Sequence, residues 1–186
     1  MPTERVTQAP VQVTPSQKEI TLVTQERLGH LAQFTDEHLA YHEAGHAVIH
    51  HLQGGTIVRL SIERTDPKEG MQPAEQLTAT GSADQLKALR DLVALLVAGE
   101  VAATIQGAPE SVVKAGGRVD REHAVRRAAE IGVDETTARA MIEAEWPRVR
   151  DRLEEPANWK LVDSLAQQLV RQKVLDADQI RATLNP

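Results

Sequence analysis

The sequence of 186 residues contains no cysteine. This absence excludes a disulfide framework and a thiolate metal site, so any bound metal must be held by histidine, aspartate or glutamate. Aromatic residues are nearly as scarce, because the chain has one Phe, one Tyr and two Trp. The core must therefore be built from Leu, Val, Ile and Ala, a composition that is typical of close-packed helices.

Long hydrophobic runs are also absent. The most apolar run, LVALLVAG at residues 92–99, is far shorter than the roughly 20 residues that a membrane-spanning helix needs. The N-terminal segment lacks the apolar core of a signal peptide. The net charge of −6 argues against nucleic acid as a partner, because nucleic acid attracts basic surfaces. We therefore expect a soluble, cytoplasmic protein that neither inserts into a membrane nor binds nucleic acid.

The chain length suits one moderate domain with a tail. Residues 1–30 are predicted to form a flexible N-terminal arm, because the first part of this segment mixes Pro, Thr, Gln and Val without periodicity. Residues 31–186 are predicted to form a compact, mainly helical domain with a small β element. Apolar spacing and capping residues predict helices at residues 36–52, 82–107, 120–131, 135–154, 158–173 and after 176, a strand at 56–64, and loops at 65–76 and 107–117.

The stretch YHEAGHAVIHH at residues 41–51 carries the strongest chemical signal. His42 and His46 are four residues apart, so on a helix both imidazoles project from one face and can share a metal ion. Glu43 is turned by about 100° on the same helix, which places it beside such an ion rather than on it. From there its carboxylate can take a proton from the water that the metal activates. The pattern H-E-x-x-H therefore predicts two zinc ligands and a general base.

Other histidines on the same helix compete with this pair. His38 and His50 extend the four-residue ladder, and His51 follows directly, but only His42 is followed by a glutamate. We assign His38, His50 and His51 to solvent or supporting roles. Gly45 lies inside the helix, where glycine is unfavourable by about 1 kcal/mol relative to alanine. This glycine predicts that another segment packs close to the metal-binding face.

A catalytic zinc needs a third protein ligand and an open fourth position. No third histidine follows at the spacing of the extended H-E-x-x-H motifs, so the ligand must come from a distant segment. The spacing alone leaves four candidates open, which are Glu100, Asp120, Glu122 and His123. Asp120 has a competing interpretation as the N-cap of a helix, because aspartate is a favoured cap.

Four segments together resemble the peptidase domain of the FtsH-type zinc metallopeptidases. YHEAGHAVI is similar to the zinc-binding helix of that family, and ALLVAGEVAATIQG to its core helix. GGRVDREHA resembles its G-A-x-x-D-x-x-x-A segment, and LAQQLVRQKVLDADQIRATL its C-terminal helices. The likeness extends in order from about residue 34 to 184. It implies that Asp120 is the third zinc ligand.

The chain departs from the family pattern at several positions. Ala103 and Thr104 stand where the family has an acidic pair, and Gly117, Arg121 and Val125 replace Ala, an apolar residue and Thr. No G-x-x-x-x-G-K-[ST] phosphate loop is present. The resemblance therefore implies a peptidase domain that stands alone, without the ATPase module or the transmembrane anchor of the family.

The predicted function is that of a zinc-dependent endopeptidase that acts on peptides or unfolded polypeptides without ATP. Zn²⁺ would be held by His42, His46 and Asp120, and Glu43 would be the base. The strand at residues 56–64 is expected to offer an edge to an extended peptide. The alternative is a zinc-binding module with weak or no catalysis that docks on a partner. By analogy with the family, a homo-oligomeric ring or a separate ATPase partner is expected.

Overall fold

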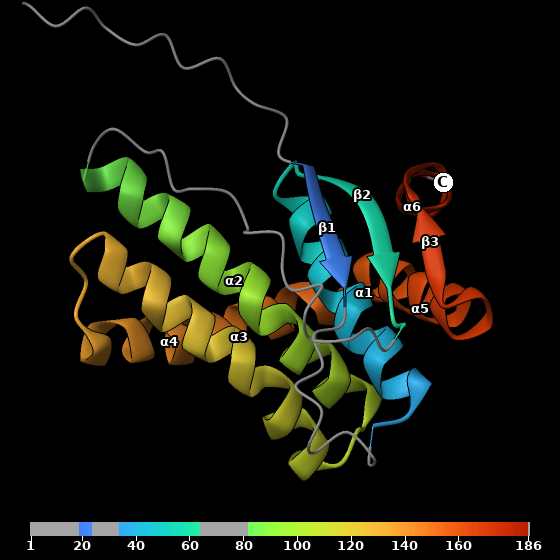
Figure 1. Ribbon diagram of the computed structural model, residues 1–186, viewed down its shortest axis with the longest axis horizontal. Coiled ribbons are helices and arrows are strands. Elements are labelled where there is room, and N and C mark those ends of the chain that lie inside the picture. The colour runs from blue at the N-terminus through green and yellow to red at the C-terminus, as the bar shows by residue number, and fades with distance from the viewer. Residues whose placement is uncertain (1–18, 24–33, 64–81, 186) are drawn as a thin grey trace, which may run out of the picture.

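The computed structural model describes residues 19–23, 34–63 and 82–185 (Figure 1). The rest of the predicted arm and the predicted loop at 65–76 lie outside these residues, so the proposed domain boundary stays a prediction. The described chain is mainly helical. Its elements are β1 (Glu19–Val23), α1 (Asp36–Leu52), β2 (Thr56–Ser61), α2 (Ser82–Gln106), α3 (Glu110–Glu130), α4 (Glu135–Glu154), α5 (Pro156–Gln172), β3 (Val174–Asp176) and α6 (Ala177–Leu184).

Helix ends with clear local signals lie where the sequence predicts them. α1 begins after Thr35, whose side chain accepts a hydrogen bond from the backbone of His38. α6 begins after Asp176, which forms a capping box with Gln179. The start of α5 is an exception, because the helix begins at Pro156, two residues before the predicted position; proline is tolerated in a first turn, where its missing N–H is not needed. The boundaries of α1 and α6 depend on a few neighbouring residues, and for that reason they are readable from sequence.

The start of α3 differs from the prediction. Residues 107–117 were expected to form a loop, with Asp120 as the cap of the following helix, but α3 already begins at Glu110. Gly116 and Gly117 therefore lie inside the helix, and Asp120 lies in its middle. Glycine is unfavourable here by about 1 kcal/mol relative to alanine, but it lets α3 approach its neighbours closely. A Cβ on Gly117 would lie 2.4 Å from a carboxylate oxygen of Glu100 in α2.

Helix α2 is the centre of the helical part, as its long apolar stripe predicts. It packs against α1, α3 and α4, whereas α1 and α3 make few direct contacts with each other. The contact between α1 and α2 is especially close at Gly45, where a Cβ would lie 2.5 Å from the carbonyl oxygen of Ala98 and 2.6 Å from Cβ of Ala102. The close approach predicted from Gly45 is thus confirmed, and it brings the α1 histidines next to α2.

On its other side, α1 is fixed to α5 through Tyr41. The Tyr41 ring stacks on Trp159 with 5.8 Å between centroids, and its hydroxyl donates a 2.5 Å hydrogen bond to Asp163. Burial, together with this bond to a carboxylate, raises the pKa of Tyr41 well above its usual range. The helix that carries the two histidines is therefore held between α2 and α5.

The three strands form one small sheet in the order β1-β2-β3, beside the helices (Figure 1). β2 pairs in parallel with β1 along its length, and antiparallel with β3 over residues 59–61. The expectation of an edge on this strand is therefore wrong for residues 59–61, which are paired on both sides, whereas residues 56–57 pair with β1 alone among the described strands. The strand also ends at Ser61 rather than at residue 64.

None of the helices within the described residues combines the length and the apolar character that crossing a bilayer requires.

Candidate metal centre

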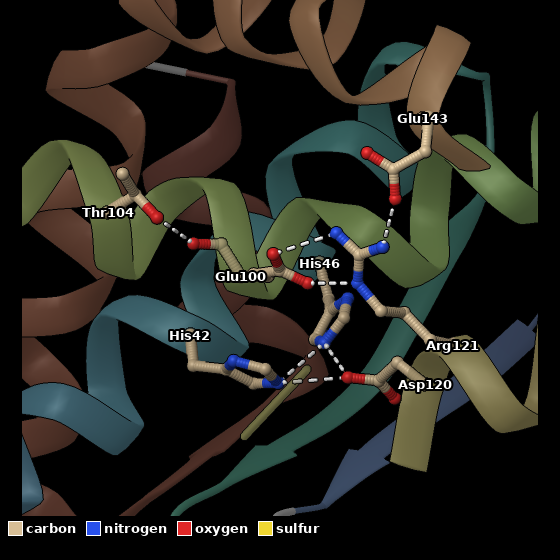
Figure 2. A network of polar contacts seen from close by, with 7 residues as sticks. All are labelled: His42, His46, Glu100, Thr104, Asp120, Arg121 and Glu143. Atoms are coloured by element: carbon tan, nitrogen blue, oxygen red, sulfur yellow. Dashed lines mark hydrogen bonds and ion pairs between the residues drawn. The ribbon is translucent and has the colours of Figure 1, made fainter. Parts of the chain in front are cut away.

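His42 and His46 lie one turn apart in α1 and face α2 together (Figure 2). Their rings meet edge to face, with centroids 4.6 Å apart, and their Nε2 atoms are 3.0 Å apart. The four-residue spacing of a helix brings two such side chains to one face, and burial against α2 limits the positions that the rings can take. Two imidazole nitrogens thus converge on one point.

Asp120 brings a carboxylate oxygen to the same point from the middle of α3 (Figure 2). Its Oδ2 lies 3.2 Å from Nε2 of His42 and 3.5 Å from Nε2 of His46. Tetrahedral ligands at about 2.0–2.1 Å from zinc are roughly 3.3–3.4 Å from one another. The three observed separations of 3.0, 3.2 and 3.5 Å are close to this value. Among the described residues, these three form the group that could hold a metal ion.

Gly99 leaves the space beside these nitrogens open. A Cβ at this position of α2 would lie 2.5 Å from Nε2 of His46 and 2.6 Å from Nε2 of His42. Both distances are far below ordinary van der Waals contact, so any larger side chain would fill the space between the α2 backbone and the two rings. The chemistry of the donor set and this opening both fit a small cation such as zinc.

The ring of His46 is held by a second hydrogen bond. Its Nδ1 lies 2.7 Å from the carbonyl oxygen of Leu95 in α2. A carbonyl can only accept, so Nδ1 carries a proton, and Nε2 is the nitrogen that can offer a lone pair to a metal once its own proton is lost. Such a partner fixes the tautomer and the orientation of a ligating histidine. The backbone of α2 therefore prepares His46 for metal binding.

The charges at the site reinforce one another. Burial alone lowers the pKa of His46, but the hydrogen bond to Asp120 and the charges of Asp120 and Glu43 outweigh it and raise the pKa to about 9. Burial also acts to raise the pKa of Asp120, yet hydrogen bonds from His42 and His46 hold it well below its usual range. The metal-free site is thus an ionised carboxylate beside a protonated imidazole at neutral pH.

This charge state predicts a pH dependence of metal binding. Zinc must displace the proton from His46, whereas Asp120 is already ionised, so the apparent zinc affinity should rise by about tenfold per pH unit from pH 6.5 to 8.5. The rise should level off near the His46 pKa of about 9. Competition titrations against a chelator of known affinity would measure it. Zinc binding that does not change over this range would contradict the assignment of a protonated His46.

Glu43 lies between the two histidines in the sequence of α1 and is only 5% exposed. Its negative charge contributes to the raised pKa of His46, so the carboxylate lies within electrostatic range of the site. Among the described residues, it does not belong to the group of ligand atoms. This position agrees with a base beside a metal rather than a ligand, and its catalytic role stays a prediction.

The other three candidates for the third ligand are placed elsewhere. Glu100 is buried in α2, but both of its carboxylate oxygens accept hydrogen bonds from Arg121. Glu122 is exposed and lies 3.8 Å from Arg118. His123 is buried, and its Nδ1 has no hydrogen-bond partner within the described part of the chain. The structure thus brings Asp120 to the histidines and leaves Glu100, Glu122 and His123 outside the group.

The competing histidines of α1 are also outside this group. His38 forms part of the helix start, where its Nδ1 accepts a 3.4 Å hydrogen bond from the backbone N–H of Thr35. His50 is buried, and its ring lies so close to Gly55 that a Cβ there would be 2.1 Å from Nε2. His51 lines a cavity of about 330 Å³ next to α6. Each has a local role that the sequence ladder alone does not reveal.

Three contributions to the site were missed at the level of sequence. Gly99 lies in an apolar helical run, and a glycine at such a position was the only sequence signal that α2 approaches another segment closely there. The Leu95 carbonyl gives no signal, because every residue has one. Arg121 was noted only as a departure from the family pattern, and its pairing with Glu100 could not be read from the spacing.

The comparisons with known proteins add no family. Neither the models of protein families nor the curated protein sequences give a match to this chain. The assignment of a function therefore depends on the geometry of the site.

Proposed function

We propose that this chain is a zinc-dependent endopeptidase similar to the FtsH-type peptidase domains, hydrolysing peptides or unfolded polypeptides without ATP. One observation supports this most strongly: His42, His46 and Asp120 converge at ligand distances from one another. Glu43 is buried on the same helix, and its charge acts on His46. A purely structural site would have no use for a base at that position.

The proposed chemistry assigns one task to each residue. When bound, the metal would polarise the peptide carbonyl and make a water molecule acidic enough to react. Glu43 would accept a proton from that water as its oxygen bonds to the carbonyl carbon, and then deliver the proton to the amine as the C–N bond breaks. Leu95 and Asp120 would keep the His46 ring in place throughout.

We propose zinc as the metal from the donor set together with the neighbouring Glu43. Two imidazoles and one carboxylate suit zinc, but the same combination also serves iron(II) in some oxygenases. The adjacent Glu43 favours zinc, because a base beside the ion is the arrangement of the H-E-x-x-H hydrolases. Elemental analysis of the purified protein should therefore measure iron as well as zinc.

The exposure of the site supports a proposal for the class of substrate. The side chains of His42 and Asp120 are 14% and 20% exposed, so an extended chain segment could approach them, whereas a folded protein surface would not. We therefore propose peptides and unfolded chains as substrates. If the protein also assembles into a ring or joins a separate ATPase, a size measurement in solution would reveal it.

The test combines metal content with peptide cleavage. Protein purified without chelator should contain one zinc per chain and cleave an unstructured, fluorescence-quenched peptide. Removing the metal should abolish cleavage, and adding zinc back should restore it. Asp120→Asn should lower zinc occupancy. A protein that folds without stoichiometric metal, or a chelated protein that still cleaves, would overturn the proposal.

The alternative is a zinc-binding module that docks on a partner and has weak or no catalysis. The sheet favours this alternative in one respect, because β2 is paired on both sides over residues 59–61, which leaves only its first residues free to pair with a peptide within the described part of the chain. A protein that binds zinc but does not turn over a range of unstructured peptides would support it.

A further inference from the structure

A second polar cluster lies directly beside the metal site, between α2 and α3. Arg121 donates two hydrogen bonds to Glu100, from Nε to Oε2 at 2.7 Å and from Nη2 to Oε1 at 2.9 Å (Figure 2). Its Nη1 donates a third bond, of 2.6 Å, to Glu143 in α4. The contact with Glu100 is therefore bidentate, which fixes direction as well as distance.

The pair is partly buried, so its geometry is constrained. Glu100 is 8% exposed, and a buried carboxylate without a partner would be strongly unfavourable. The hydrogen bonds to Glu100 outweigh the effect of burial and raise the pKa of Arg121 further above its ordinary value. Gly117 makes room for the carboxylate, because a Cβ there would lie 2.4 Å from Oε2 of Glu100.

The residues of this cluster are neighbours of the metal ligand on α3. Gly117 lies one helical turn before both Asp120 (i+3) and Arg121 (i+4), and Arg121 directly follows Asp120 in the chain. On α2, Glu100 directly follows Gly99, which lies against the two histidines. The contact that holds α3 on α2 therefore lies one residue from the ligand Asp120 on α3, and one residue from Gly99, which lies against both histidines, on α2.

We infer that Glu100 and Arg121 are positioning residues, whose two parallel hydrogen bonds fix α3 on α2 so that Asp120 stays at ligand distance from the histidines. The inference rests on the metal site of the proposed function. α1 and α3 make few direct contacts, so the position of Asp120 relative to α1 is set mainly through α2. A sliding of α3 along α2 would change both the bidentate contact and the distances from Asp120 to the histidines.

A purely electrostatic role for Arg121 predicts that replacing this residue strengthens zinc binding, whereas a positioning role predicts that it weakens zinc binding. Its positive charge repels a metal cation, so removing the charge alone would strengthen zinc binding. Removing a positioning contact would instead weaken zinc binding, by about 10- to 100-fold for partners of metal ligands. The sign of the change in zinc affinity therefore separates the two roles.

The experiment compares Arg121→Met with Arg118→Met, and measures the zinc dissociation constant by chelator competition. Arg118 lies on the same helix and its side chain is 62% exposed, so its replacement removes one positive charge but no buried contact. We expect about 10-fold or greater weakening for Arg121→Met, and unchanged or slightly tighter binding for Arg118→Met. Binding by Arg121→Met that equals or exceeds that of Arg118→Met would overturn the inference.

Arg121→Lys provides a second test that preserves the charge and the fold. Lysine offers a point contact in place of the planar fork, so zinc binding should still weaken, and the cobalt(II) absorption spectrum should change. Wild-type affinity with an unchanged cobalt spectrum would overturn the inference. If the wild-type protein binds no metal, the proposed function fails first. If the wild type binds zinc and both Arg121 variants match it, only the positioning role fails.

Discussion

Replacing Gly99 with alanine should abolish zinc binding at ordinary concentrations. The new Cβ would lie 2.5 Å from Nε2 of His46 and 2.6 Å from Nε2 of His42, so both rings would have to move. α2 cannot shift away from α1 easily, because it also packs against α3 and α4. Loss of a single partner of a ligand weakens binding by up to about 100-fold, and displacing two ligands should exceed that. Chelator competition would measure the effect.

Gly116→Ala is the matched control for this substitution. Its Cβ would make ordinary contacts, at 3.4 Å from Phe34 and 3.5 Å from Nδ1 of His42, and alanine favours the helix by about 1 kcal/mol. This variant should keep its zinc and should be as stable as the wild type or more stable.

The stability of metal-free Gly99→Ala should fall by about 1–3 kcal/mol, as overpacking predicts. Stoichiometric, tight zinc binding in Gly99→Ala would show that the ion does not bind at the two imidazoles.

The second large effect concerns turnover rather than binding. Glu43→Gln should lower the rate of peptide cleavage by about 10²- to 10⁴-fold, because the amide has nearly the same shape but cannot accept the proton. Zinc should remain bound, since Glu43 is not in the group of ligand atoms. The measurement is kcat for an unstructured peptide, with zinc content determined on the same samples.

The control for Glu43→Gln is Glu122→Gln, which removes the same charge from an exposed position on α3. It should retain both turnover and zinc. Equal turnover in Glu43→Gln and the wild type would remove Glu43 from the mechanism. If neither protein cleaves and both bind zinc, the binding-module alternative would be favoured.

The sequence predicts those features of the site that lie within one helix. The spacing of His42 and His46, the adjacent Glu43 and the cap at Thr35 are local, and the structure places α1 over the predicted residues. The mainly helical class follows in the same way from the spacing of apolar residues. Gly45 also predicted a close packing partner, although not which segment it was.

Features that depend on contacts between helices could not be predicted from the sequence. The pair Gly116–Gly117 resembles a loop in sequence, whereas in the structure it serves close packing inside α3. The spacing did not distinguish Glu100 from Asp120 as a ligand. Only the folded chain shows that the carboxylate of Glu100 accepts hydrogen bonds from Arg121. The pairing of β2 on both sides likewise depends on two segments far away in sequence.

Because α2 separates α1 from α3, a bound metal would also contribute to the stability of the fold. Because these two helices make few direct contacts, an ion held by His46 and Asp120 would be a cross-link between distant parts of the chain. The unfolded chain has no such preformed site, so the free energy of binding would add directly to that of folding. The proportion of folded molecules in a cell would then follow the local zinc supply, and a chain made during zinc shortage would be the more readily degraded.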